Sequence, residues 1–402
     1  MPSEPFGVVD LFSGTGGMSY GFHAHDSFKL LGSADAQRGK PTSASGTLGC
    51  NSSYELNIGI APVEADLGQI DPADLRGLMG LEGASVPVML ACPPCTGFSR
   101  AQSKNHVVDD PRNSLVARVA LFVREFQPKV LVMENARELV MGRFSRHLVQ
   151  LTLELEDMGY QVSAETHFLS KFGLPQRRER ALVVAVKRPL ALLGMADLWA
   201  GVRIDEKATH VRRAIWDLNV SEPLHAGQRS AADPMHVSPS FASGRSLARI
   251  QAIPKDGGSW VDLVPESADL LNPSMLRSVA AGRLGTHPDV YGRMAWDRPA
   301  PTIKRESAHV GNGRYVHPTQ DRLCTVREMA ILQGFPRNFM FGGSNLANMY
   351  RHIGDAVPPL ISYQLAHLVA WSLTGSRPSH DELVLHHTHL KSSDLQVAAA
   401  AS

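Results

Sequence analysis

Cys95 stands in a turn whose composition favours nucleophilic chemistry. The apolar run Val86–Ala91 leads directly into Cys92-Pro93-Pro94-Cys95. The two prolines fix the backbone and remove amide donors, so we expect Cys95 in a rigid loop at the carboxyl edge of a sheet, where a thiolate would be a strong nucleophile. The alternatives are an inert buried cysteine and a Cys-x-x-Cys redox or zinc centre. Zinc would need two further soft ligands, and Cys50 and Cys324 are isolated in the sequence.

An acid and two arginines follow downstream. The apolar run Lys129–Met133 ends at Glu134, whose carboxylate could enter the same crevice and donate a proton to a ring nitrogen. Arg178 and Arg180 alternate along a segment that reads as extended, which predicts that both face one side. There they could hold a base carbonyl and a phosphate. Considered alone, Glu134 could equally be the capping residue of a helix, and the two arginines could belong to a solvated cluster of charges.

A glycine-rich turn, Asp10–Gly17, follows the first apolar run and opens a helix. Its glycines would let a ligand approach the backbone, and the helix start offers free amide donors. Ser19 stands where the third glycine of the dinucleotide fingerprint belongs. The turn therefore predicts a nucleoside cofactor, with a ligand-free strand–helix turn as the alternative. Asp35 is placed to hold ribose hydroxyls, and Asp66 could accept a hydrogen bond from an adenine amino group, although each acid alone also fits a solvated loop.

Strands alternating with helices must position these residues. Short apolar runs predict strands, and Ser145–Met158 predicts a helix because its leucines recur on one face. Such alternation favours an α/β fold with a parallel sheet covered on both faces. The expected strands are 6–12, 28–34, 86–91, 129–133, 160–169 and 180–186.

Composition limits the class of protein. The 402 residues give room for one large domain and a smaller one, and the 43% hydrophobic content is that of an ordinary globular protein. No apolar run approaches the length of a membrane span, the start lacks a signal-peptide pattern, and four cysteines are too few for a disulfide scaffold. We therefore expect a reducing, cytoplasmic setting. A net charge of +1 does not by itself indicate a nucleic-acid partner.

Taken in order, these motifs resemble the C5-cytosine-specific DNA methyltransferase family. The similar segments span roughly residues 8 to 370. They are Asp10–Gly17, Pro93-Pro94-Cys95, Asp110–Leu115, Glu134-Asn135, Gln176-x-Arg178-x-Arg180, Arg298–Ile303, Arg327–Pro336 and Gly354–Pro359.

The resemblance implies a DNA (cytosine-5)-methyltransferase and a role for each matching residue. Cys95 would add to C6 of a cytosine flipped out of the duplex, Glu134 would hold and protonate N3, and Arg178 would lie on the O2 side of the base, with Arg180 as a fourth catalytic residue. A methyl group would pass from S-adenosylmethionine to C5 without a metal. The implied cofactor-binding residues are Phe12, Ser13, Gly14, Thr15, Gly16, Gly17, Asp35, Asp66, Leu67, Pro94, Leu115, Asp355 and Val357.

The resemblance also implies the layout. A Rossmann-like S-adenosylmethionine-dependent methyltransferase domain would comprise residues 1–188, completed by about 346–373, with a smaller target-recognition domain at 189–345. The polar stretch 374–402 predicts a disordered tail. The implied partners are double-stranded DNA, bound by a monomer, and a possible cognate restriction endonuclease, with no membrane, in a bacterial, nucleoid-associated setting.

Some departures from the family leave alternatives open. Asp355 replaces the usual asparagine, which keeps an acceptor but loses the amide donor. A pocket retuned for a modified donor is one interpretation, and ordinary S-adenosylmethionine with a tolerated aspartate is the simpler one. Asp35 replaces a glutamate, and the stretch 37–47 is longer than usual. The rivals are a tRNA cytosine methyltransferase, whose Cys-Phe-Thr tripeptide is missing here, a non-catalytic DNA-binding scaffold and, remotely, an NAD-dependent Rossmann enzyme.

Overall fold

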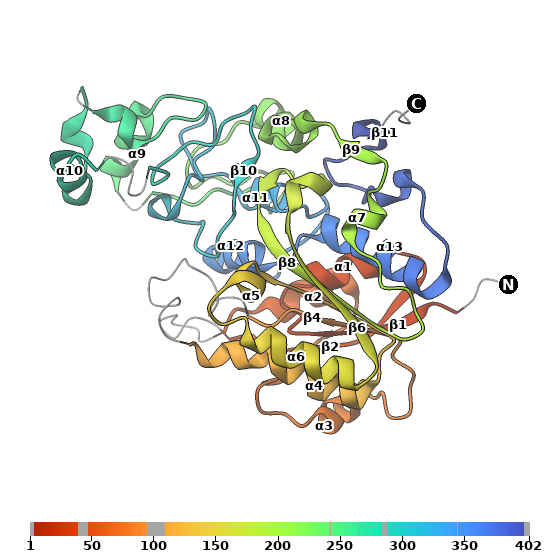
Figure 1. Cartoon of the computed structure of the whole chain (residues 1–402). Helices are drawn as coiled ribbons and strands as arrows, with labels where there is room; N and C mark the ends of the chain where they lie inside the picture. The colour runs from red at the N-terminus through yellow and green to blue at the C-terminus, as the bar shows by residue number, and fades with distance from the viewer. Residues whose placement is uncertain are drawn as a thin grey trace.

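A seven-stranded sheet with the order β3-β2-β1-β4-β5-β8-β6 forms the centre of the protein (Figure 1). The computed structural model describes residues 4–38, 47–94, 109–241, 243–264, 266–283, 288–343 and 345–397, so Cys95 lies outside the described residues. The strands are β1 (Phe6–Leu11), β2 (Phe28–Asp35), β3 (Val63–Glu64), β4 (Val88–Ala91), β5 (Val130–Ala136), β6 (Tyr160–Phe168) and β8 (Glu179–Lys187).

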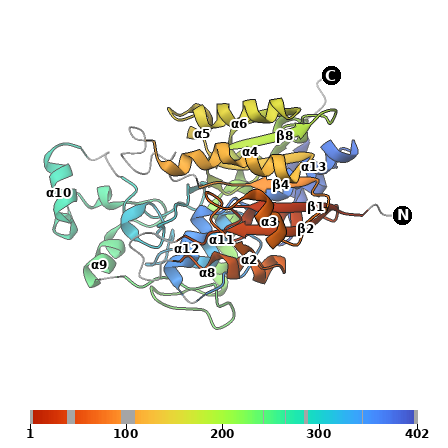
Figure 2. The ribbon, with the colours of Figure 1, turned by 90° about the horizontal axis from the view of Figure 1, so that it is seen from below.

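Helices cover both faces of this sheet, as the alternation of elements predicts (Figure 2). One face packs against α1 (Gly17–His23), α2 (Cys50–Ile58), α7 (Met195–Leu198) and α13 (Pro359–Thr374). The other packs against α3 (Pro72–Leu78), α4 (Ser114–Phe126), α5 (Glu138–Met141) and α6 (Arg146–Asp157). Leu148, Leu151 and Leu155 of α6 are buried, which confirms the helix predicted there.

The direction of β8 corrects the expectation of a parallel sheet. β1, β2, β3, β4 and β5 pair in parallel, but β8 runs antiparallel to both β5 and β6. The connection from β6 to β8 contains only a short 3-10 turn (Leu169–Phe172) and the two-residue strand β7 (Gln176–Arg177). A parallel return requires a longer crossover, usually with a helix, so this connection brings β8 back antiparallel.

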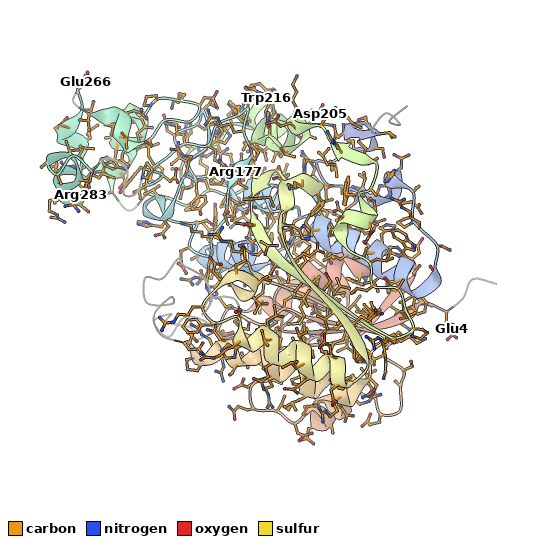
Figure 3. All side chains as sticks on the ribbon, in the orientation of Figure 1. Glu4, Arg177, Asp205, Trp216, Glu266 and Arg283 are labelled. Carbon is orange, nitrogen blue, oxygen red and sulfur yellow. The ribbon has the colours of Figure 1, made fainter. Side chains whose placement is uncertain are left out.

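A second region extends from one end of the sheet (Figure 1). There α8 (Val211–Ser221), α11 (Val326–Leu332) and α12 (Leu346–Asp355) share one core. A smaller core is centred on Trp260 and lies with α9 (Gly244–Ala252) and α10 (Pro273–Ala280). Glu266 and Arg283 mark the end of this region farthest from the sheet (Figure 3). β10 (Ala300–Pro301) joins the region to β7 in a two-stranded parallel sheet.

The expectation of a disordered tail is wrong for residues 375–397. β11 (Leu395–Val397) pairs antiparallel with β9 (Val202–Ile204), Leu383 and Leu390 are buried, and buried His389 contacts the carbonyl of Gly173. Most residues of this segment are polar, but a few apolar side chains, Leu383 and Leu390 among them, pack against distant parts of the chain.

The packing of the chain does not follow the predicted domain limits near residue 189 and near residue 346. Met195, Leu198 and Val202 join the core of the sheet, although they follow residue 189. α12, which lies in the segment 346–373 expected to complete the large domain, contributes Met349 and Ile353 to the core it shares with α8 and α11. Only α13 of the closing segment packs on the sheet side, against α1, so the division of the chain into two domains stays a prediction.

Candidate active site

The glycine-rich turn after β1 has the backbone shape of a ligand cradle. Phe12 and Gly14 adopt positive φ angles of 59° and 52°, and Gly16 adopts 86°. A Cβ built on Gly14 would meet nothing within 4 Å, so the backbone there borders open space. Ser13 anchors the turn by donating from its backbone amide to the carbonyl of Ala34 on β2 at 3.1 Å. The turn is therefore held in shape while a glycine backbone stays accessible.

The closing helix α13 completes this cradle by direct contact. A Cβ on Gly17 would lie 2.3 Å from the carbonyl oxygen of Val357, and one on Gly21 would lie 2.1 Å from the amide of Tyr363. Only glycine permits such contact, so α1 and the start of α13 touch backbone to backbone. Val357, 340 residues away from Gly17 in the sequence, is thereby brought to the glycine-rich turn, as its predicted role requires.

One acid lies beside the turn, and a second follows strand β3. Asp35, at the end of β2, accepts hydrogen bonds from the amides of Gly14 at 3.0 Å and Gln37 at 2.6 Å. Asp66 accepts from the amide of Gly68 at 3.0 Å and forms an ion pair with Arg38. The Gly14 bond places the carboxylate of Asp35 at the turn itself, where a ribose would lie.

An apolar contact follows next to the second acid. A Cβ on Gly68 would lie 3.2 Å from both Leu115 Cδ2 and Asp66 Oδ1, so Leu115, in the first turn of α4, lies close to Asp66. Leu67 is buried beneath them. A cradle, an acid at the end of β2, and a second acid with an apolar neighbour suit a nucleoside cofactor.

A buried hydrogen-bonded group supports the turn from behind. Ser19 donates to Asp10 at 2.7 Å, and its hydroxyl also lies 2.7 Å from the hydroxyl of Tyr54. Burial raises the pKa of Asp10 to about 7, the Ser19 bond opposes the shift, and Asp35 adds to it. In the sequence, Ser19 was noticed only because it replaces the third glycine of the dinucleotide fingerprint. No motif in the sequence pointed to Tyr54.

Glu134 and Arg180 meet at the carboxyl edge of the sheet. Glu134 is 6% exposed, and the Nε of Arg180 lies 3.0 Å from its Oε1. The antiparallel register sets Leu182 opposite Glu134 and Arg180 opposite Ala136, so Glu134 and Arg180 are diagonal neighbours on one face. The carboxylate of Glu134 and the guanidinium of Arg180 are thus held together where solvent has little access.

Asn135 ties this edge to the proline turn. Its side chain is fully buried, and Nδ2 donates to the carbonyl of Pro93 at 3.0 Å. Its Oδ1 accepts from the amide of Ala136 at 2.8 Å. Pro94, the last described residue of the turn, follows Pro93 directly, so Asn135 fixes the backbone one residue before the described part of the turn ends.

Searches against known proteins agree on one family. A model of C-5 cytosine-specific DNA methylases matches residues 6–370. The chain belongs to this family. It is similar to the type II methylase M.HgiDII of Herpetosiphon aurantiacus (29% identity over 92% of this chain and 96% of that protein) and to the type II methyltransferase M.Eco47II of Escherichia coli (31% identity over 89% and 76%). In fold it resembles a crystal structure of a prophage-encoded putative DNA modification methyltransferase from Escherichia coli (TM-score 0.60, 19% identity, 92% and 100% covered).

As a member of this family, the chain is a DNA (cytosine-5)-methyltransferase with S-adenosylmethionine as its cofactor. The fold class predicted from the motifs is confirmed by the matches and by the sheet. None of the described helices is long and apolar enough to cross a membrane. No group of three or more potential metal ligands occurs among the described residues.

The guanidinium of Arg178 bonds backbone carbonyls of distant segments, and its contact with the O2 side of a base stays a prediction. Its side chain is buried, and its guanidinium donates to the carbonyls of Ile303 at 3.2 Å, Gly354 at 3.4 Å and Ala356 at 3.3 Å. It therefore joins the segment after β10 to the turn between α12 and α13. Arg180, rather than Arg178, is the arginine of this motif that contacts the expected catalytic acid.

Arg305 was not singled out in the sequence, yet it lies against one of the expected cofactor residues. Its Nη1 lies 2.8 Å from Oδ2 of Asp355. Burial raises the pKa of Asp355 to about 6, although Arg305 and Arg178 oppose the shift. The two residues are fifty positions apart, and no spacing in the sequence pointed to their contact.

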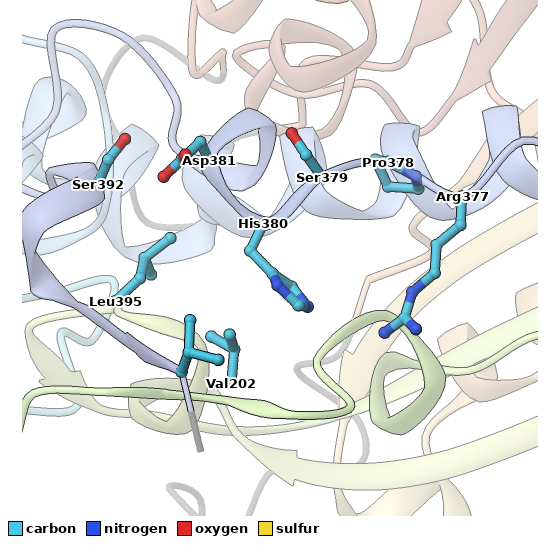
Figure 4. A pocket seen from close by; sticks show the side chains of 9 residues that line it. Val202, Arg377, Pro378, Ser379, His380, Asp381, Ser392 and Leu395 are labelled. Atoms are coloured by element: carbon cyan, nitrogen blue, oxygen red, sulfur yellow. The ribbon is translucent and has the colours of Figure 1, made fainter. Parts of the chain in front are cut away.

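A separate hollow of about 420 Å³ lies away from these residues, between β9, β11 and the segment after α13 (Figure 4). Arg377 and His380 extend toward it, and Val202 and Leu395 form its apolar side. None of the predicted site residues lines this hollow.

Proposed function

We propose that Cys95, Glu134 and Arg180 carry out the chemistry on the cytosine ring. The observation that carries this proposal is the Glu134–Arg180 contact at 3.0 Å beside a proline turn that Asn135 fixes at 3.0 Å. Cys95 follows Pro94 directly in the sequence. A nucleophile and an acid would thus both be available to one pyrimidine.

The residues divide the reaction between them. The target cytosine leaves the stack, because its ring edge cannot be reached inside a duplex. The Sγ of Cys95 forms a bond to C6 while the carboxyl group of Glu134 donates its proton to N3, so the negative charge of the addition passes from the ring to the carboxylate. Arg180 keeps the carboxylate of Glu134 oriented toward that nitrogen. After C5 has gained its methyl group, a base removes the C5 proton. The electron pair of that C–H bond re-forms the C5–C6 double bond as the Cys95–C6 bond breaks and releases the thiolate, and N3 returns its proton to Glu134.

The cofactor site has the groups that S-adenosylmethionine needs. Bound there, the cofactor supplies a methyl group on a sulfonium, already activated without a metal. Asp35 would accept from the ribose hydroxyls and Asp66 from the adenine amino group, which requires that Arg38 shift from Asp66. The remaining cradle comprises Phe12, Ser13, Gly14, Thr15, Gly16, Gly17, Leu67, Pro94, Leu115, Asp355 and Val357.

The comparisons support double-stranded DNA as the substrate. We further propose that the enzyme works as a monomer, and that a restriction endonuclease of the same specificity accompanies it in the bacterial cytoplasm, near the nucleoid. The similarity to named type II methyltransferases supports this setting.

Covalent trapping tests the assignment of Cys95. DNA containing 5-fluorocytosine retains fluorine where the proton must leave, so a C6 adduct should accumulate with wild-type protein and S-adenosylmethionine. Cys95→Ser, as the matched control, should give no adduct. Mass spectrometry of nucleosides from treated DNA should show 5-methylcytosine. If the wild-type protein forms no adduct, the result favours a non-catalytic DNA-binding scaffold. An adduct on tRNA alone favours a tRNA cytosine methyltransferase. A C5 substituent other than methyl favours a modified donor.

A further inference from the structure

Two arginines of the motif at residues 176–180 have partners that leave the expected phosphate contact unassigned. The sequence indicated Arg178 and Arg180 for a base carbonyl and a phosphate. In the structure the guanidinium of Arg178 is buried against backbone carbonyls, and the Nε of Arg180 lies 3.0 Å from the carboxylate of Glu134. Because this acid balances the charge of Arg180, a DNA phosphate at this edge of the sheet requires another cation.

Arg177 directly precedes Arg178 and is the exposed residue of this motif. Its two neighbours are buried, and the Nε2 of Gln176 donates to the Oε1 of Gln333 at 2.7 Å. The amide of Arg178 bonds the carbonyl of Gln176 at 2.9 Å, which makes a tight turn at Arg177. The side chain of Arg177 is therefore directed outward, while the side chains before and after it enter the core.

The backbone of Arg177 is fixed where the sheet meets the second region (Figure 3). β7 pairs with β10, which sets Arg177 opposite Pro301. The hydroxyl of Thr302 donates to the carbonyl of Arg177. An exposed guanidinium is thus attached to a backbone that is held from both parts of the chain.

The proposed position of the cytosine lies close to Arg177 along the chain. Arg177 precedes Arg180 by three residues, so their Cα atoms are at most about 10 Å apart. The start of β8 lies at the carboxyl edge of the sheet, beside Glu134. A base that leaves the stack to reach Glu134 stays attached to its sugar and phosphates, which remain outside the pocket. The side chain of Arg177 can therefore reach the DNA backbone beside that base.

The charge of Arg177 is not balanced by a neighbouring acid in the part of the chain that the structure describes. By contrast, Arg137 at the same edge pairs with Glu179 at 2.7 Å and with Glu138 at 3.3 Å. Several arginines of the second region are also paired with acids: Arg212 with Asp297, Arg314 with Asp289 and Arg337 with Asp217. Because the net charge is only +1, attraction of a phosphate to this edge depends on such an individual unbalanced cation.

We propose that Arg177 binds the DNA phosphate next to the extruded cytosine. This inference rests on the proposed position of the cytosine beside Glu134 and Arg180. The planar fork of an arginine matches the oxygens of a phosphate in a bidentate contact. A phosphate contact carries no sequence information, but it fixes the register of the strand on the protein. Arg177 thus holds the strand while Arg180, three residues later, holds the acid.

The salt dependence of DNA binding by the full-length protein tests the proposal. The probe is a short labelled duplex centred on a cytosine that the wild-type protein methylates, as located by bisulfite sequencing of treated DNA. With S-adenosylhomocysteine present, fluorescence anisotropy gives the affinity between about 50 and 200 mM salt. Each lost phosphate contact reduces the slope of log affinity against log salt by about 0.9. Arg177→Met should show this reduction, with affinity lowered roughly tenfold at the lowest salt.

Arg124 provides the matched control, because it is also an exposed arginine but lies in the last turn of α4. That turn precedes β5 and lies at the amino edge of the sheet, about 20 Å from the carboxyl edge. Arg124→Met should leave both slope and affinity unchanged. Arg177→Lys should keep the wild-type slope, whereas Arg177→Gln should lose as much as Arg177→Met.

The possible outcomes separate this inference from the proposed function. An unchanged slope for Arg177→Met would overturn the proposal even if binding is weaker, because a structural defect does not remove a single ionic contact. An equal reduction by Arg124→Met would overturn it as well, since the effect would then follow from net charge. Equal slopes for Arg177→Lys and Arg177→Gln would do the same, and this comparison decides if Arg177→Met does not fold. A wild-type protein that methylates no cytosine would instead refute the proposed function on which this inference rests.

Discussion

Replacing Asn135 with alanine should separate the placement of the nucleophile from binding of the cofactor. The buried side chain of Asn135 bonds the carbonyl of Pro93 and the amide of Ala136. Leaving a buried polar group without its partner costs about 1–3 kcal/mol, so the variant should lose roughly 2–6 kcal/mol of the free energy of unfolding. Domains of ordinary stability have about 5–15 kcal/mol, so a loss near the lower end leaves the protein folded at 25 °C, and a urea titration of the variant gives the folded fraction on which the rate is measured.

The loss should appear mainly in the rate of covalent addition. Without the bond to Pro93, the turn that leads to Cys95 is free to shift, and a displacement of about 1 Å can cost on the order of 100-fold in rate. Adduct formation with 5-fluorocytosine DNA at saturating S-adenosylmethionine should slow by about 10- to 100-fold. Affinity for S-adenosylhomocysteine should fall much less than the adduct rate, because Asn135 bonds none of the residues of the glycine-rich turn and affects the cradle only through the turn that carries Pro94.

Asn57 offers a control of the same residue type. Its side chain also joins two segments, donating to the carbonyls of Ser53 at 2.6 Å and Met340 at 2.7 Å. Asn57→Ala should therefore lower the midpoint of urea unfolding without a comparable loss in the adduct rate. An Asn135→Ala protein that is folded and forms the adduct at the wild-type rate would refute the role given to this side chain.

Three further outcomes follow from the structure. Arg178→Met should lower the free energy of unfolding by about 3 kcal/mol or more in urea titrations, because three carbonyls lose a charged donor; unchanged stability with selectively weaker binding of cytosine-containing DNA would instead support contact with the base. Asp355→Asn should raise the Tm of the ligand-free protein more at pH 8 than at pH 5. The pKa near 6 lies above the ordinary value, so the folded state binds this proton more tightly than the unfolded state, and the stability so gained at low pH is lost as the pH rises through about 6. A Tm gain equal at both pH values would contradict this. Deleting residues 376–402 should lower Tm by several degrees, since buried Leu383 and Leu390 each contribute about 1.5–3 kcal/mol; an unchanged Tm would show that their packing is dispensable.

Local sequence predicted those features that depend on neighbouring residues. Apolar runs that end in Asp35 and Glu134 gave both the strands and the acids at their carboxyl ends, because a strand and the residue after it are adjacent in the chain. The same holds for the glycine-rich turn, whose positive φ angles follow from its residue types. These predictions needed no knowledge of distant contacts.

The failures concern contacts that a local pattern does not contain. Alternation placed Arg178 and Arg180 on one side, but the amide of Arg178 bonds the carbonyl of Gln176 at 2.9 Å. A bond between residues two apart marks a tight turn at Arg177. Arg178 therefore follows a turn and precedes β8, and its guanidinium bonds the carbonyls of Gly354 and Ala356, whereas Arg180 contacts Glu134. The tail and the Arg305–Asp355 pair depend on partners between 50 and 216 residues away.

The strand direction that the sequence did not predict also explains how the proposed catalytic pair forms. Because β8 runs antiparallel to β5, its first residues lie at the carboxyl edge of the sheet, where β5 ends. Arg180, the second residue of β8, thereby comes opposite Ala136 and reaches Glu134 two positions earlier on the same face. A parallel β8 would have carried Arg180 to the amino edge of the sheet, a strand length away from Glu134. The contact between Glu134 and Arg180 is therefore a consequence of the antiparallel direction of β8. That direction depends in turn on the short connection between β6 and β8.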